Sequence, residues 1–381
     1  MNNLHISLTE FKNESRLLKQ ANTLIKNNTF NNVYIAAVNS GHCVENEEVN
    51  DSIAVKRFNL SSKKIGKNLL SQILKYFEFS FRVLFNYKQK NISVINVHSL
   101  AVLPLGVILK YIYNAKLIYD AHELETESNG LTGVRKKLSK ITERLLISKV
   151  DKIIVVSESI ADWYSNFYGI SRPTVVMNAP ALVQIDKQNR FRDELSIKAD
   201  DKIFLYQGAL FSGRGIELLL EAFKSIQHEK VVIVFMGYGT LEEQIIEAAN
   251  QFPNIYFYPA VAPDVVLEYT ASADVGLSII ENKCLSYYYC MPNKLFEYAM
   301  VGIPVIASNM KDMSEFVNEY NTGMIIEDNT LEQLQSTIIK MSKKETSSFS
   351  QDCRNASTKF CWEIQEVKML NIYDELKEGS C

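Results

Sequence analysis

The residue types best suited to chemistry gather in residues 284–308, CLSYYYCMPNKLFEYAMVGIPVIAS. A helix is expected to begin near Asn293, directly after Pro292. The first backbone N–H groups of a helix are unpaired and carry the positive end of its dipole, so this turn could bind an anion. Lys294 adds a cation, and Glu297 could accept hydrogen bonds from the vicinal hydroxyls of a ribose. An ordinary helix start with a solvated glutamate explains the same pattern equally well.

Two histidines of the first half also follow expected strands. His122, in YDAHE, comes just after the strand expected at 116–119, and ligands of open parallel sheets bind at the carboxyl ends of strands. A neutral imidazole there could hydrogen-bond a substrate hydroxyl, or it could simply pair with Glu123 as a structural side chain. His98, in NVHS, is open to the same two interpretations.

Short β-branched runs alternate with helical stretches along the chain. This alternation predicts parallel sheets built from βαβ units, and these sheets must position the residues named above. The expected strands are 4–8, 33–38, 53–58, 94–97, 116–119, 152–156, 174–177, 203–206, 231–236, 255–258, 275–279, 304–307 and 322–326. The expected helices are 14–26, about 64–87, 102–113, 135–148, 215–226, 241–250, 265–271, 294–301 and 331–343.

A polar break near residues 178–201 interrupts this alternation and contains Pro180. The sequence therefore predicts an α/β protein with two Rossmann-like domains, residues 1–180 and residues 181–359, and a cleft between them.

The net charge of −3 over 381 residues hides an asymmetry. Residues 1–180 carry 23 Lys and Arg against 15 Asp and Glu, and the remainder carries 18 against 29. The first half is therefore expected to meet something anionic, such as a phospholipid surface or a phosphorylated substrate. No compact basic-aromatic module indicates a nucleic-acid partner. Residues 61–90 are basic at both ends and rich in Phe, Tyr and Leu, which is typical of an amphipathic helix on a membrane surface or of an ordinary sheet-covering helix.

Composition excludes several protein classes. With 47% hydrophobic and 22% charged residues, the chain can form packed cores. No apolar run approaches the roughly 18–20 residues of a bilayer span, and the start does not look like a secretory signal, so a cytoplasmic location is expected. The six cysteines show no C-x-x-C pair, which argues against a zinc site or a disulfide framework.

Residues 284–308 resemble the donor-site signature of the retaining, GT-B-fold, group 1 type nucleotide-sugar glycosyltransferases. The PNKLFEY form of the signature, residues 292–298, is similar to that of members that build bacterial surface polysaccharides such as lipopolysaccharide and capsule. Other segments that resemble the family, in order, are residues 96–127, 206–223, 236–245 and 361–376. The last of these looks like the C-terminal helix, about 360–378 here, which in this fold crosses back to the first domain.

The resemblance implies a role for each matching residue. Arg214 would bind the donor diphosphate and act in catalysis together with Lys294 and the helix start at Asn293, and Glu297 would hold the ribose. The full donor set implied is Gly208, Arg214, Gly237, Tyr289, Asn293, Lys294, Leu295 and Glu297.

Two positions depart from the family pattern. Ala209 stands where relatives usually carry a second basic residue, and Lys294 could supply part of that charge. Tyr289 stands where they usually carry the first glutamate of a pair.

His122 corresponds to the family's active-site histidine near the anomeric centre, which makes it the second implied catalytic residue. The glycine pair that many relatives carry after the first strand is absent from residues 7–16. The acceptor side therefore rests on weaker candidates, namely Glu10, Lys12, Arg16 and His98.

The function implied is transfer of a sugar from a nucleotide diphosphate, most simply a UDP-sugar, to a saccharide acceptor on a lipid carrier. The nucleotide-sugar is a co-substrate, and neither a metal nor a bound cofactor is expected. Two alternatives remain open. A non-catalytic sugar-nucleotide-binding or scaffold protein would explain Ala209 and Tyr289, whereas a nucleotide-sugar 2-epimerase would need more acid and base groups than five histidines readily supply.

Overall fold

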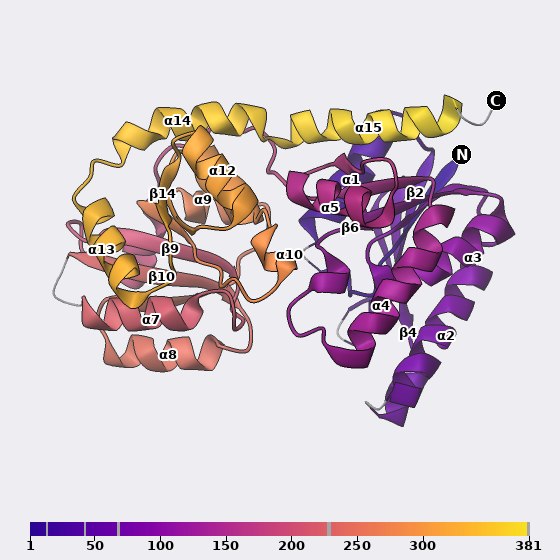
Figure 1. Cartoon of the computed structure of the whole chain (residues 1–381), viewed down its shortest axis with the longest axis horizontal. Coiled ribbons are helices and arrows are strands. Elements are labelled where there is room, and N and C mark those ends of the chain that lie inside the picture. Colours follow the sequence, from indigo (N-terminus) through magenta and orange to yellow (C-terminus); the bar gives the residue numbers. More distant parts are fainter. Residues whose placement is uncertain (13, 42, 67–68, 227–229, 379–381) are drawn as a thin grey trace. The chain divides into compact units, whose positions relative to one another are not determined.

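A computed structural model describes the chain except for residues 13, 42, 67–68, 227–229 and 379–381 (Figure 1). The chain divides into two compact units. The first unit comprises Met1–Val176 and Glu366–Cys381, and the second comprises Met177–Gln365. The division thus falls four residues before the expected end of the first domain, at residue 180.

The first unit is built on an eight-stranded sheet with the order β3-β4-β2-β1-β5-β6-β7-β8. Neighbouring strands are parallel except for the antiparallel pair β3 and β4. The strands are β1 (Asn2–Ile6), β2 (Asn32–Asn39), β3 (Asn46–Asn50), β4 (Ile53–Asn59), β5 (Ile92–Val97), β6 (Lys116–Ala121), β7 (Lys152–Val155) and β8 (Thr174–Val175). The central strands β1, β5 and β6 are almost wholly buried, as expected for a parallel sheet covered on both faces.

Helices cover this sheet. They are α1 (Ser15–Lys26), α2 (Leu69–Tyr87), α3 (Leu103–Tyr113), α4 (Gly133–Leu146), α5 (Glu158–Tyr168) and α15 (Trp362–Glu378). Side chains of α1 and β5 hydrogen-bond to the C-terminal helix α15. The Oγ1 of Thr23 in α1 donates to Glu366 at 3.0 Å, and the amide of Asn96 in β5 donates to the hydroxyl of Tyr373 at 2.8 Å.

The second unit has a six-stranded parallel sheet with the order β11-β10-β9-β12-β13-β14. Its strands are β9 (Lys202–Ala209), β10 (Val231–Tyr238), β11 (Ile255–Pro259), β12 (Val275–Ser278), β13 (Val305–Ser308) and β14 (Gly323–Ile326). Its helices are α6 (Arg190–Leu195), α7 (Ile216–Ser225), α8 (Glu242–Gln251), α9 (Val266–Thr270), α10 (Leu285–Tyr288), α11 (Asn293–Met300), α12 (Lys311–Glu319), α13 (Leu331–Ser342) and α14 (Ser347–Lys359).

The predicted fold class, an α/β protein with two Rossmann-like sheets, is confirmed. Each expected strand is present, with small differences at its ends. The elements that the sequence did not predict are β3, α5, α6, α10, α12 and α14. The helix expected at about 64–87 is instead a 3₁₀ turn, Ser61–Ile65, followed by α2 from Leu69. No helix in the described part of the chain is both long and apolar enough to cross a membrane.

One glycine fixes how α11 lies on the second sheet. A Cβ on Gly276 of β12 would lie 2.3 Å from the ring of Tyr298 in α11. The Tyr298 hydroxyl in turn donates to the carbonyl of Leu205 at 2.9 Å and to that of Leu277 at 3.2 Å. The helix can therefore pack closely against β9 and β12, and this packing sets the position of its first turn.

Gly276→Ala should lower the free energy of unfolding by about 1–3 kcal/mol, because the added methyl overlaps a buried ring. Urea unfolding followed by circular dichroism measures the change. In the Gly276→Ala/Tyr298→Leu double variant the two effects should not add, since the ring that the methyl meets is gone. Strict additivity would contradict this packing argument.

Candidate active site

A buried polar cluster lies at the carboxyl edge of the first sheet. His5 belongs to β1, His98 follows β5, and Asp120 and His122 lie at the end of β6. Because these three strands are neighbours in the order β1-β5-β6, their ends bring the four side chains together. His5, His98 and Asp120 are buried, whereas the His122 side chain is 37% exposed.

The three histidines form a chain of ring nitrogens. Nδ1 of His5 lies 2.8 Å from Nε2 of His98, and Nδ1 of His98 lies 3.1 Å from Nε2 of His122. Asp120 Oδ2 lies 3.3 Å from Nδ1 of His98. The distances are satisfied when His5 donates to His98 and His98 donates to Asp120. Burial, and next the neighbouring His98, hold the pKa of His5 well below its usual value, while burial lowers that of His98, so both rings are neutral at pH 7.

Asp120 is the charge at the centre of this cluster. Arg16 of α1 contacts both carboxylate oxygens, with Nε at 3.1 Å and an Nη at 2.7 Å, and it also donates to the carbonyl of Val176. Gln20 donates to Oδ2 at 2.7 Å. Burial alone would raise the pKa of Asp120, but the charges of Arg16 and His122 and the hydrogen bonds hold it well below its usual range.

His98, Asp120 and His122 also place potential metal-ligand atoms within 4.8 Å of one another. Their surroundings do not fit a cation. The Arg16 guanidinium already neutralises the carboxylate from both oxygens and would repel a metal ion beside it. The arrangement fits a hydrogen-bonded network better than a metal centre.

The predicted acceptor residues divide in two. Arg16 and His98 are buried in this network. Glu10 lies at the surface, where its Oε1 accepts from the backbone N–H of Ser40, and Lys12 is exposed.

The second cluster lies at the start of α11 in the second unit. Lys294 is 7% exposed, and its Nζ lies 3.7 Å from the centroid of the Tyr206 ring. Among the described residues this ammonium has no hydrogen-bond partner. Burial, and next the nearby Arg214, lower the pKa of Lys294 to about 7. A buried cation without a hydrogen-bonded partner is costly, and an anion at this point would remove that cost.

Arg214 belongs to the loop between β9 and α7, and its guanidinium lies 5.2 Å from the centroid of the Tyr287 ring. Glu297, one turn into α11, accepts a hydrogen bond from Gln207. The other end of the Gln207 amide accepts from Thr270 at 2.9 Å. The strand β9 thus orients the carboxylate that the sequence assigned to a ribose.

The remaining predicted donor residues occupy different surroundings. Gly208 has φ +120°, and a Cβ on its strand neighbour Gly237 would lie 1.9 Å from the Gly208 carbonyl oxygen, so both positions require glycine. Asn293 begins α11 and is exposed. Tyr289 is half-buried near the ammonium of Lys311. Leu295 is packed in the core, and its N–H donates to the carbonyl of Pro292.

Sequence reasoning missed the side chains that support these groups: Tyr206, Gln207, Tyr287, His5 and Asp120. The aromatic supports could have been found only as aromatic residues near the ends of β9 and α10. Nothing in the sequence pairs Gln207 with Glu297 or Arg16 with Asp120, because those pairs are 90 and 104 residues apart.

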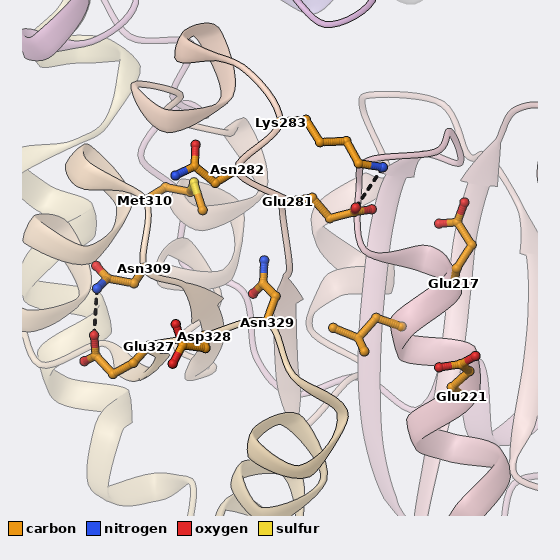
Figure 2. A pocket seen from close by; sticks show the side chains of 11 residues that line it. Glu217, Glu221, Glu281, Asn282, Lys283, Asn309, Met310, Glu327, Asp328 and Asn329 are labelled. Atoms are coloured by element: carbon orange, nitrogen blue, oxygen red, sulfur yellow. Dashed lines mark hydrogen bonds and ion pairs between the residues drawn. The ribbon is translucent and has the colours of Figure 1, made fainter.

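A pocket of about 580 Å³ lies elsewhere at the carboxyl edge of the second sheet (Figure 2). Figure 2 shows Glu217 and Glu221 of α7 on one side, Glu281 and Lys283 near the β12 end, and the Glu327–Asn329 turn on the other side. Its carboxylates outnumber its single lysine, so this pocket does not suit a diphosphate. None of the predicted donor residues lines it.

Comparisons with known proteins bear on both units. The model of the Glycosyl transferases group 1 family matches residues 187–360, and that of Glycosyltransferase Family 4 matches residues 31–179. An uncharacterised glycosyltransferase of Methanocaldococcus jannaschii is 24% identical over 245 residues, 59% of this chain and 59% of that protein. Lipopolysaccharide 1,2-N-acetylglucosaminetransferase of Salmonella typhimurium is 26% identical over 186 residues, 45% of this chain and 48% of that protein. The chain thus spans about half to three fifths of these relatives.

Solved structures resemble the whole chain. Sucrose-phosphate synthase from Thermosynechococcus elongatus has a TM-score of 0.82 at 15% identity, covering 100% of both chains. The Anabaena protein HepE in complex with UDP and glucose has a TM-score of 0.73 at 14% identity, covering 98% of this chain and 100% of that one. At such low identity these similarities show the fold alone, which is the GT-B fold.

Asp120→Asn should destabilise the first unit by roughly 3–5 kcal/mol, because it leaves the Arg16 charge buried without its counterion. The folded pKa of Asp120 is depressed, so its contribution is present above its unfolded pKa of about 3.9 and is lost as pH falls through the lower folded value. The gap between wild type and variant in urea unfolding should therefore be constant from pH 5 to 8 and shrink below about pH 4.

Asp162→Asn is the matched control, because Asp162 pairs with Arg172 at an exposed site. It should cost about 1 kcal/mol or less. Equal losses in the two variants would contradict the importance assigned to Asp120.

Proposed function

Because residues 187–360 match the model of the group 1 glycosyl transferases and the chain has the GT-B fold, we propose that this protein transfers a sugar from a nucleotide diphosphate to a saccharide acceptor with retention of configuration. The donor proposed is a UDP-sugar. HepE, a structural neighbour, is described in complex with UDP and glucose, which supports this choice of nucleotide.

Lys294 is the observation that carries the proposal. It is a buried ammonium without a hydrogen-bonded partner among the described residues, located at the first turn of α11 and close to Arg214. A diphosphate would supply the missing hydrogen-bond acceptors and add negative charge to that of the nearby Glu297, with the helix start and both cations on one side of it. These protein groups provide the positive charge that a leaving diphosphate needs, so the proposed reaction uses no metal.

Glu297 would bind the ribose in this arrangement. Its carboxylate is already oriented by Gln207, and it lies one helical turn beyond Lys294, on the side expected for the sugar next to a diphosphate at the helix start. A carboxylate can accept from two vicinal hydroxyls at once, which would distinguish a ribonucleotide from its deoxy analogue.

His122 would act at the donor sugar. Its ring is partly exposed while the buried His98 and Asp120 hold one of its nitrogens, so the ring is pre-oriented. The proposed chemistry is a front-face substitution. The bond from the anomeric carbon to the phosphate oxygen breaks, the acceptor oxygen bonds to that carbon on the same face, and the departing phosphate takes the acceptor's proton. His122 stabilises this transition state by a hydrogen bond to the sugar.

The acceptor proposed is a saccharide on a lipid carrier, in surface polysaccharide synthesis at the inner face of the cell membrane. One relative is named as a lipopolysaccharide transferase, and the basic balance of residues 1–180 favours anionic surroundings. The rival function is a non-catalytic sugar-nucleotide-binding protein, which the departures at Ala209 and Tyr289 favour. UDP binding without donor hydrolysis or transfer by the purified protein would select that rival.

Lys294 should make UDP binding depend on pH. Without a ligand the pKa of Lys294 is about 7, and binding of an anion favours the protonated form of this side chain. The dissociation constant of UDP, measured by calorimetry from pH 7 to 9, should rise by up to about tenfold per unit. Lys294→Arg keeps its charge at every pH and should remove this slope, and Lys294→Met should remove both slope and affinity. A slope of the same size in either variant would place the phosphates elsewhere.

His122→Ala should lower kcat by roughly 10²-fold and leave the UDP dissociation constant unchanged, because the contact is made mainly in the transition state. Its melting temperature should stay near that of wild type, since the side chain is partly exposed. A fully active His122→Ala protein would remove this residue from the mechanism.

A further inference from the structure

Helix α2 exposes a row of large apolar side chains. Phe77 and Phe81 are each 64% exposed and Phe85 is 56% exposed, and their spacing of four residues places them on one side of the helix. Phe79 and Val83 are fully buried on the opposite side. A helix that only covers a sheet needs one apolar side, so the exposed phenylalanine row is not explained by folding.

Helix α4 also exposes a row of apolar side chains, and here the opposite, buried side of the helix carries a charged residue. Val134, Leu138, Ile141 and Leu145 are 72%, 57%, 54% and 65% exposed. Glu143 lies on the opposite side of the helix and is buried. The polar side of this amphipathic helix therefore faces inward, and its apolar stripe faces solvent.

Glu143 explains why α4 is held in this orientation. Its carboxylate accepts hydrogen bonds from the hydroxyls of Tyr119 at 2.9 Å, Tyr164 at 2.6 Å and Tyr168 at 2.6 Å. Three donors satisfy the buried carboxylate, so the helix cannot rotate its apolar stripe inward without breaking all three bonds.

Helix α3 lies beside both α2 and α4 (Figure 1). It exposes Ile108, Tyr111 and Ile112. Its contacts with α2 are direct, because the Tyr76 hydroxyl accepts from the N–H of Leu105 and the Tyr113 hydroxyl donates to the carbonyl of Leu84. An apolar groove of about 590 Å³ lies between α2 and α3. We refer to the exposed apolar residues of α2, α3 and α4 as the apolar face.

Basic side chains flank the stripe on α4. Arg135, Lys137 and Arg144 are exposed beside it, and the one acidic residue of this helix is the buried Glu143. Apolar side chains bordered by cations complement a lipid surface with anionic headgroups, since the hydrocarbon receives the first and the headgroups pair with the second. A two-fold dimer through this face would instead bring like charges together from both copies.

We propose that the apolar face docks on the surface of an anionic phospholipid bilayer. The phenylalanines of α2 and the aliphatic stripe of α4 enter the boundary between headgroups and acyl chains, while the α4 cations pair with headgroups. This inference does not depend on the proposed transfer reaction, because its surface lies within the first unit and shares no residue with the predicted donor set.

The test is co-sedimentation of the full chain with vesicles of phosphatidylcholine and phosphatidylglycerol in a 7:3 ratio, and with vesicles of phosphatidylcholine alone. The wild type should sediment with the anionic vesicles, and less so as salt rises. Phe77→Ser/Phe81→Ser and Leu138→Gln/Ile141→Gln should each weaken binding at least about tenfold. Arg135→Gln/Lys137→Gln/Arg144→Gln should weaken binding to anionic vesicles by roughly 10²-fold.

Ile364→Gln/Val367→Gln is the matched control, because it removes two comparably exposed aliphatic side chains from α15, outside the apolar face. It should bind vesicles as the wild type does. Wild-type protein that stays in the supernatant with both vesicles would overturn the proposal. So would a dimer, seen by light scattering without lipid, that dissociates in the α2 and α4 variants, because the apolar face would then be covered by a second copy.

Discussion

Asp120 carries a negative charge inside the first unit, where Arg16 stabilises it by contacting both of its oxygens. That contact does more than neutralise a charge. Arg16 also reaches the carbonyl of Val176, so one guanidinium links α1, the end of β6 and the segment that follows β8. The orientation of His98, and through it of His122, depends on this pair, since their nitrogens meet at the same carboxylate.

The second unit uses the opposite arrangement. Lys294 is also buried, yet its Nζ lies over the face of the Tyr206 ring and has no hydrogen-bond partner among the described residues. The first unit thus pairs its buried charge by hydrogen bonds within the fold, whereas the buried ammonium of the second has no hydrogen-bonded partner among the described residues. A satisfied buried pair gives rigidity and orientation, and an unsatisfied buried charge gives affinity for a counter-ion. The proposed division into a positioning edge and a phosphate-binding edge follows from this difference.

The apolar face shows the same principle on a surface. Glu143 is satisfied by three tyrosine hydroxyls, and this inward polar contact forces the aliphatic stripe of α4 outward. The exposed stripe is therefore a consequence of a well-satisfied interior and not of poor packing. Helices α2 and α3 add their own exposed apolar side chains to this stripe. Together the three helices present the apolar face that we propose as a docking surface.

The sequence by itself determined the alternation of strands and helices and the two-sheet architecture, and it indicated segment 284–308 as a candidate site, because these depend on local periodicity and on glycine and proline at fixed positions. It predicted Lys294, Glu297 and His122, which lie at strand or helix ends that periodicity can locate. Only the tertiary structure decided what each side chain meets. It placed Arg16 and His98 in a buried hydrogen-bond network and Leu295 in the core. Partners such as Asp120 and Gln207 are about a hundred residues from the groups they orient, and no local pattern encodes a contact made only when strands become neighbours in a sheet.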